Sequence, residues 1–119
     1  MIEHPKTFFI DIDGTILYHL NDFAKVLDTD DIPPLPYASE KVGKWHCQGH
    51  TVILTTARPE SMRARTIKQL DNAGIVYDQL VMGLTNGVRM LINDYVPDTS
   101  CKAEARNVRR NIDGLTNID

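Results

Sequence analysis

The chain has 119 residues, a length that fits one domain. Its 42% hydrophobic and 24% charged residues are ordinary for a soluble globular protein. The formal net charge of -3 gives no basic footprint for nucleic acid, and no apolar run approaches the length of a membrane span. The N-terminus lacks a signal-peptide pattern, and the two cysteines, Cys47 and Cys101, match no metal-ligand spacing. We therefore expect a single cytoplasmic domain over residues 1–119, with reduced thiols and no nucleic-acid or membrane partner.

The first predicted strand covers residues 7–12 and is apolar on both faces, as a central parallel strand requires. It brings Asp11 and Asp13 to its C-terminal end, where Gly14 and Thr15 follow. In an open α/β sheet that edge is where ligands bind. A glycine there allows the backbone to turn sharply and approach a phosphate.

Residues 16–36 carry an acidic, polar stretch and three prolines, and they predict a flap or loop rather than a regular element. A helix is expected from about Tyr37, with Ala38, Val42 and Trp45 on one face and Gly49 at its end. The bulk of Trp45 favours a core anchor over a surface that stacks a ligand.

Strand and helix then alternate along the chain. Residues 51–56 predict a second strand, Pro59 to Gly74 a helix, residues 80–82 a third strand, residues 83–87 a turn and residues 88–93 a fourth strand. This order predicts right-handed crossovers and a parallel sheet. In the tail, residues 102–110 predict either a short helix or an edge strand, with a preference for the strand, and residues 111–119 are expected to fray.

Polar side chains follow three of the predicted strands. Asp11 and Asp13 follow the first strand, and the second ends in Thr55 and Thr56 with Arg58 close behind. The fourth ends in Asn93 and Asp94, with Asp98 a few residues on. Because parallel strands end at one edge of a sheet, these groups are expected to converge there.

Residues 11–15, Asp-Ile-Asp-Gly-Thr, resemble motif I of the haloacid dehalogenase (HAD) superfamily. The resemblance implies an α/β fold: a Rossmann-like three-layer sandwich with a mostly parallel central sheet, an HAD core without a large cap domain. It implies residues 16–36 as a flap beside the active site. It also implies Mg²⁺ as the cofactor and a small phosphorylated substrate.

The same resemblance assigns roles to the other strand ends. Thr56 resembles the motif II residue that hydrogen-bonds a phosphoryl oxygen, with Thr55 the alternative if the register shifts by one. Arg58 is then a phosphate clamp, or alternatively a surface residue at a helix start. Asp94 resembles the motif IV metal ligand, with Asn93 in the place of a second acid and Asp98 as a further carboxylate.

Motif III, which supplies a positive charge, has two candidates. Arg89 is the only basic residue between Gly74 and Asp94, and Lys102 follows Asp98. Arg89 is preferred, with Lys102 as the alternative phosphate-binding base.

The resemblance implies an aspartyl-phosphate mechanism. Asp11 attacks phosphorus, Asp13 transfers protons, and Mg²⁺ is bound by Asp11, the Asp13 carbonyl and Asp94. Gly14 and Thr15 belong to the turn whose backbone N–H groups stabilise the phosphoryl oxygens. The substrate would be a phosphate monoester such as a sugar phosphate or related metabolite, and a homo-oligomer is compatible with a capless enzyme that borrows a lid from a neighbouring subunit.

Two other functions remain open. Asn93 and the absence of a motif III lysine are also compatible with an HAD-fold module that binds metal or a phosphorylated partner without turnover. A signalling receiver domain is disfavoured, because its phosphoacceptor ends the third strand and this chain offers only Asp78 there, before the apolar core of that strand.

Overall fold

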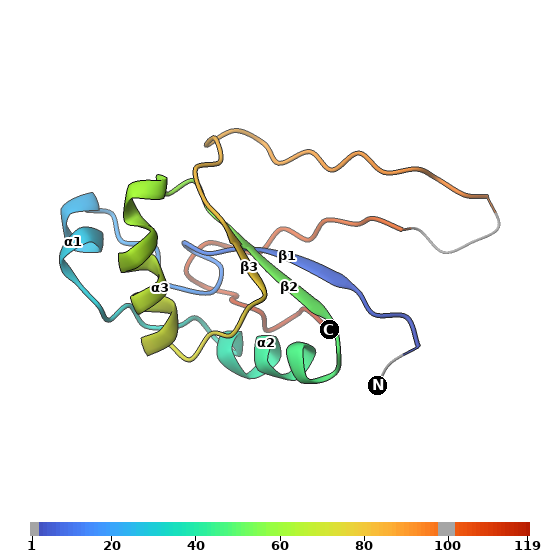
Figure 1. Cartoon of the computed structure of the whole chain (residues 1–119), viewed down its shortest axis with the longest axis horizontal. Helices are drawn as coiled ribbons and strands as arrows, with labels where there is room; N and C mark the ends of the chain where they lie inside the picture. Colours follow the sequence, from blue (N-terminus) through green and yellow to red (C-terminus); the bar gives the residue numbers. More distant parts are fainter. Residues whose placement is uncertain (1–2, 98–101) are drawn as a thin grey trace.

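The computed structural model describes residues 3–97 and 102–119. Along the chain its elements are β1 (Thr7–Asp11), α1 (Phe23–Asp28), α2 (Ala38–Cys47), β2 (Thr51–Thr55), the 3-10 turn η1 (Glu60–Met62), α3 (Arg63–Asn72) and β3 (Gln79–Val81) (Figure 1).

The three strands form one parallel sheet in the order β1-β2-β3. In the register of the sheet Asp11 lies opposite Thr55, and Thr55 opposite Val81, so the strands end at a common edge. The prediction of a parallel α/β fold is confirmed, and the arrangement is consistent with a Rossmann-like fold. Each predicted strand and helix up to β3 is present, with ends that differ by a few residues at most.

Side chains on one face of the sheet form the core, together with α2 and α3. Ile10, Leu54 and Leu80 point into it, and Leu70 of α3 is fully buried there. Trp45 is 4% exposed and stacks on Phe8 with ring centroids 4.0 Å apart, which confirms it as a core anchor. Two right-handed crossovers that advance the sheet in one direction place both helices on this same face.

The opposite face of the sheet is open. Phe9 is 59% exposed and Val81 38%, although both are apolar strand residues. The prediction that the first strand is central is therefore wrong for the described chain, because β1 has β2 on one side and forms the edge of the sheet.

Residues 16–36 are more ordered than a loose flap. They contain α1, which starts where the Asp22 side chain accepts a hydrogen bond from the Ala24 N–H. Leu17 forms isolated bridges with Asp13 and Pro34, which hold the segment against the end of β1. Five of its apolar residues are buried in the core or beside it: Ile16, Leu17, Val26, Ile32 and Leu35.

The predicted fourth strand is absent from the described structure. Residues 84–97, here called the arm, leave the sheet after β3, turn near the C-terminal ends of the strands and run back in the direction opposite to the strands, beyond the body of the molecule (Figure 1). The apolar residues expected to form the strand are exposed, Val88 to 90% and Ile92 to 86%. The radius of gyration is 14.9 Å, whereas a compact chain of this length has about 13.5 Å. The arm thus lengthens a molecule that is otherwise compact.

Both predictions for the tail are wrong. Described residues 102–110 form neither a helix nor an edge strand, and residues 111–119 pack against the body instead of fraying. Leu115 is buried, and its N–H donates to the Pro36 carbonyl. Lys41 holds the end of the chain by donating to the carbonyls of Thr116 and Ile118. The sequence did not indicate this because the contacts join residues about 75 positions apart.

No helix in the described part of the chain has the length and apolar character to cross a membrane.

Candidate active site at the end of β1

Asp11 ends β1 and offers a half-exposed carboxylate. Its side chain is 48% exposed and accepts a hydrogen bond of 3.2 Å from the Thr15 hydroxyl. The Arg89 guanidinium, at the base of the arm, lies 3.8 Å from the other oxygen. One carboxylate oxygen is therefore oriented by its own turn, and the other faces a positive charge.

Loss of surrounding water raises the pKa of Asp11 above its ordinary value, and the nearby Asp13 carboxylate raises it further. The Thr15 hydroxyl, Arg89 and the Ile12 N–H oppose both effects. Although the side chain keeps about half of its exposure, desolvation is the largest of these causes. Two neighbouring carboxylates, one of them half-exposed, can attract a cation, either alone or bound to a phosphoryl group.

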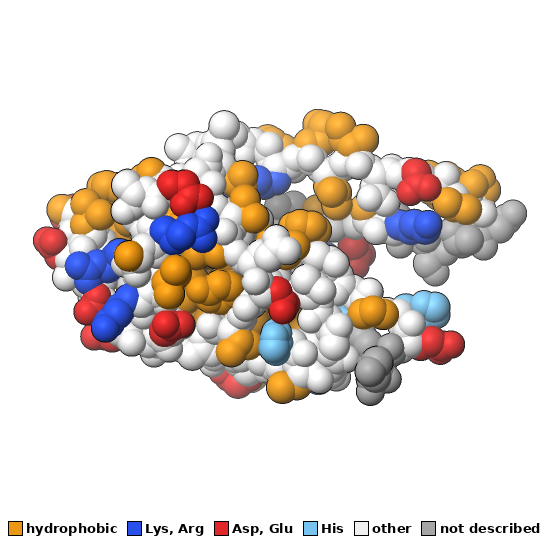
Figure 2. All heavy atoms as spheres, in the orientation of Figure 1, with side chains coloured by type: hydrophobic (Ala, Val, Ile, Leu, Met, Phe, Trp, Pro, Cys, Tyr) orange, Lys and Arg blue, Asp and Glu red, His pale blue; other side chains and the backbone are white. Residues whose placement is uncertain are grey.

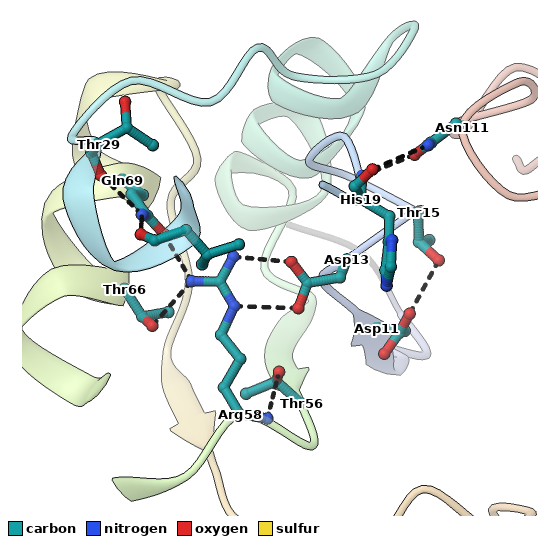
Figure 3. A network of polar contacts seen from close by, with 11 residues as sticks. Asp11, Asp13, Thr15, His19, Thr29, Thr56, Arg58, Thr66, Gln69 and Asn111 are labelled. Atoms are coloured by element: carbon teal, nitrogen blue, oxygen red, sulfur yellow. Dashed lines mark hydrogen bonds and ion pairs between the residues drawn. The ribbon is translucent and has the colours of Figure 1, made fainter. Parts of the chain in front are cut away.

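Asp13 is held differently, by a buried arginine (Figure 3). Arg58 donates from Nε and Nη2 to the two Asp13 oxygens, at 3.0 and 2.7 Å. The Arg58 side chain is 5% exposed and that of Asp13 24%. A bidentate pair of this kind fixes both the position and the orientation of the carboxylate.

Arg58 is itself anchored by α3. Its Nη1 donates to the Thr66 hydroxyl at 3.0 Å and to the Gln69 side-chain carbonyl at 2.5 Å. Gln69 in turn donates to the carbonyls of Val26 and Thr29, so the network reaches α1 (Figure 3). Both sequence interpretations of Arg58 are corrected: it is neither on the surface nor open to a phosphate, because each of its terminal nitrogens already has a partner.

The two threonines at the end of β2 have different environments. Thr56 is 1% exposed, and its hydroxyl oxygen accepts the Arg58 N–H at 3.0 Å, which is the role of a cap at the strand end. Thr55 is half-buried and lies opposite Asp11 in the register, on the same face of the sheet. The geometry therefore favours Thr55 as the hydroxyl closer to Asp11.

Gly14 forms the turn that the sequence indicated, with φ of +88°, a value that favours glycine. Its N–H donates to Leu17 and the Thr15 N–H to Ile12. The expectation that these two N–H groups face a phosphate is corrected, because both donate within the turn. Thr15 contributes its hydroxyl instead.

His19 is a residue that the sequence did not single out. The Asn111 side chain pairs with both the N–H and the carbonyl of His19, at 2.7 and 3.1 Å, and fixes its backbone. Figure 3 shows its ring pointing toward Asp11. Its Nδ1 is buried and, among the described residues, without a hydrogen-bond partner. No local sequence pattern marks this histidine, since its partner lies 92 positions away.

Of the two motif III candidates, the structure brings Arg89 to Asp11. Lys102 is exposed on the segment that returns from the arm and makes no described contact with Asp11. The sequence had predicted Arg89 to lie in a fourth strand. In the structure it reaches the site from the start of the arm instead.

The predicted motif IV residues are not brought together with Asp11. Asn93 and Asp94 are exposed on the arm, and Asp98 lies outside the described residues. In the described ranges no group of three His, Cys, Asp or Glu residues is arranged to hold a metal ion. Mg²⁺ is commonly bound through one or two carboxylates and several waters, so the half-exposed Asp11 carboxylate fits one ligand position of such an ion.

Comparisons with known proteins extend this description. No family model and no curated protein matches the chain. It is similar to a chain in a solved Pnkp1/Rnl/Hen1 complex, with 28% identity and a TM-score of 0.59, over 74% of this chain and 31% of that one. A second likeness, to a chain of a Pnkp1/Rnl/Hen1 RNA repair complex, has 30% identity and a TM-score of 0.58, over 71% of this chain and 28% of that one.

The chain therefore spans about a third of the length of these two structural relatives. A protein from Vibrio cholerae has the same fold with 19% identity and a TM-score of 0.52, over 87% of this chain and 83% of that one. These likenesses agree with an α/β fold built on a parallel sheet.

Proposed function

We propose that the chain is a capless member of the HAD superfamily, with a Rossmann-like three-layer core, that hydrolyses phosphate monoesters through an aspartyl-phosphate intermediate. One observation carries the proposal. Asp11 stands half-exposed at a strand end beside a guanidinium, whereas Asp13, two residues on, is fixed by a buried one. Neighbouring carboxylates in unlike surroundings are suited to different roles in one reaction.

Asp11 is the nucleophile. One of its oxygens attacks phosphorus, and the bond between phosphorus and the leaving oxygen breaks. Thr15 holds the carboxylate in place, and Arg89 lies where it neutralises charge on the phosphoryl oxygens. Mg²⁺ would supply further charge neutralisation when bound by Asp11, the Asp13 carbonyl and an Asp94 carboxylate that the arm has to bring to the site.

Asp13 moves the protons. In its acid form it donates to the leaving oxygen, and protonation weakens one of its two bonds to Arg58. The resulting carboxylate, which the Arg58 pair orients, accepts a proton from the water that hydrolyses the aspartyl phosphate. The function of Arg58 in this scheme is to position Asp13.

The test is phosphate release from a generic aryl phosphate with and without Mg²⁺. We expect turnover that EDTA abolishes and that Asp11→Asn lowers by at least about 10³-fold. Asp28 is an exposed carboxylate at the end of α1. Asp28→Asn is therefore the matched control and should retain wild-type turnover.

The substrate panel should then cover sugar phosphates, nucleotides and oligoribonucleotides with a phosphate at either end. The oligonucleotides are included because two structural relatives come from RNA repair complexes. Folded protein that releases no phosphate from any member of the panel would contradict the proposal.

The second candidate is an HAD-fold module that binds a phosphorylated partner without turnover. The position of Asp94 on the arm favours this candidate, because within one chain the site then lacks its predicted motif IV metal ligand. Binding of a phosphorylated substrate that Asp11→Asn retains, in protein that shows no turnover, would support it.

A further inference from the structure

The outer edge of β1 has no neighbouring strand. In the sheet β1 pairs with β2 on one side, and in the described structure nothing continues the sheet on the other. An open edge offers unpaired N–H and C=O groups to another strand. Phe9, on the uncovered face of β1, is 59% exposed and adds an apolar contact for such a strand.

The arm has the properties of the strand that is missing. Residues 88–93 are mostly apolar, yet they belong to no strand. Figure 2 shows hydrophobic side chains exposed along the arm. Four of them are at least half exposed: Val88 at 90%, Met90 at 79%, Leu91 at 59% and Ile92 at 86%. An exposed apolar patch of this kind on a small protein marks an interaction surface.

The connector is too short for the arm to become a parallel strand beside its own β1. Only residues 82–87 separate the end of β3 from Val88. The seven Cα-to-Cα steps from Val81 to Val88 reach about 24 Å when fully extended. A parallel return has to cross three strand spacings and run back the length of β1, about 22 Å in a straight line through the sheet, and the path around the strands is longer than this line. Parallel crossovers in proteins accordingly use a dozen residues or more.

An antiparallel strand beside its own β1 would satisfy the connector. It would, however, carry Asn93 and Asp94 to the N-terminal end of β1, away from Asp11. Within one chain, therefore, no strand formed by the arm brings Asp94 to the candidate site.

We propose that two copies of the chain exchange their arms, so that residues 88–93 of each pair in parallel with β1 of the other. In the proposed register Met90 lies opposite Phe8, Leu91 opposite Phe9, and Asn93 opposite Asp11. The two arms then lie side by side in antiparallel orientation about a two-fold axis, in one continuous sheet. A two-fold axis is the commonest symmetry of such pairs.

The exchange completes the candidate site, and this part of the inference rests on the proposed function. Arg89 stays with Asp11 of its own chain, to which it is already 3.8 Å away. The following four residues carry Asp94 to the end of the second copy's β1, where it joins that copy's Asp11. Each site then combines Asp11 and Arg89 from one copy with Asp94 from the other.

The first test needs no activity. The mass in solution, measured by light scattering after gel filtration, should be twice the 13.4 kDa of the chain. In a Cys47→Ser, Cys101→Ser background, Phe9→Cys chains mixed and refolded with Leu91→Cys chains should form a disulfide that joins one chain of each kind. Neighbouring parallel strands place the paired Cα atoms about 4.8 Å apart, within disulfide range.

Phe9→Cys chains alone should give no cross-link, because both arms lie between the two β1 strands, and Lys68→Cys on α3 should give none with Phe9→Cys. A monomer in solution, a dimer without the mixed disulfide, or a disulfide within one chain of a Phe9→Cys, Leu91→Cys protein would each overturn the exchange.

The second test uses turnover. Asp11→Asn and Asp94→Asn chains should each be inactive, whereas a refolded equimolar mixture should recover about a quarter of wild-type activity, because half of the dimers are mixed and each has one intact site. Inactive mixtures of cross-linkable dimers would overturn the shared site. Wild-type protein that is inactive but dimeric and cross-linked would contradict the proposed function and leave the exchange supported.

Discussion

Two aspartates two positions apart have become chemically different through residues that are distant in sequence. Asp13 receives both of its hydrogen bonds from Arg58, 45 positions away, whereas Asp11 contacts a threonine of its own turn and an arginine at the base of the arm. The motif places the carboxylates at the strand end, and the tertiary contacts decide which of them is rigid and which is accessible.

The raised pKa of Asp11 has a consequence for stability. Its folded-state pKa lies above the ordinary 3.8, so the folded protein binds this proton more tightly than the unfolded chain. Its contribution to the free energy of unfolding is thus largest below pH 3.8 and is lost as pH rises through the folded-state pKa. In EDTA at pH 7, Asp11→Asn should therefore melt at a higher temperature than wild type, and the difference should shrink toward pH 4.

Asp113→Asn is the control of opposite sign. Hydrogen bonds from Arg109 lower the pKa of Asp113, so this carboxylate stabilises the folded state above pH 3.8 and its stabilisation is lost as pH falls through the lowered pKa. Asp113→Asn should melt below wild type at pH 7. Thermal unfolding followed by circular dichroism measures both, and an Asp11→Asn protein less stable than wild type at pH 7 would contradict the assigned cause.

Arg58 should be the most sensitive charged residue in the described chain. Arg58→Ala leaves Asp13 without either donor and empties a buried site, at a cost of about 3 kcal/mol or more in the free energy of unfolding. Arg65→Ala removes a pair with Asp30 in which both side chains are over a third exposed, so it should cost about 1 kcal/mol or less. Urea unfolding of the two variants is the measurement, and equal losses would show that burial of the Arg58 network does not matter.

At the scale of elements, the C-terminal segment shows where a prediction from the local sequence pattern fails. Residues 111–119 are polar and look disordered in sequence, yet they pack over the loop that precedes α2. The reason is a close approach: Gly114 has φ of +53°, and a Cβ there would lie 2.5 Å from the Pro36 carbonyl oxygen. A side chain at this position is therefore incompatible with the observed packing.

Placing an alanine in the left-handed backbone region costs roughly 1–2 kcal/mol. Gly114→Ala should lower the free energy of unfolding by more than this, because the contact with Pro36 is lost as well. Gly43→Ala is its matched control. Gly43 is inside α2 with no atom within 4 Å of an added Cβ, so alanine should stabilise the protein by about 0.5–1 kcal/mol. Denaturant unfolding should give opposite signs for the two variants; a neutral Gly114→Ala would mean that the tail does not dock in solution.

At the scale of the whole molecule, the parallel sheet is covered by helices on only one of its two faces. The helices cover one face, and the edge of β1, the opposite face and the arm remain open. A parallel sheet is ordinarily buried on both faces, so a single chain leaves apolar surface that a second copy can cover.

This predicts that stability depends on protein concentration. If two copies exchange arms, the melting temperature should rise with concentration, because association stabilises the folded state by mass action. Leu91→Glu places a charge in the exchanged strand and should make the melting temperature both lower at high concentration and independent of it. Differential scanning calorimetry over a hundredfold range of concentration decides this, and a constant wild-type melting temperature would contradict the exchange.

The sequence by itself determined the elements whose signals are local. The apolar run before Asp11, the i, i+4, i+7 spacing that ends in Trp45, and Pro59 and Gly74 around the second helix each specify a strand or helix within a few residues. The alternation of these elements then leaves little choice but right-handed parallel crossovers.

Only the tertiary structure decided what depends on contacts between distant residues. It paired Arg58 with Asp13, fixed His19 through Asn111, docked the tail on Pro36 and left residues 88–93 outside the sheet. The apolar pattern of that last segment predicts a strand, and in the described structure these residues form none. Whether a neighbour is within reach depends on the length of the connector and the position of β1, and both are properties of the folded chain.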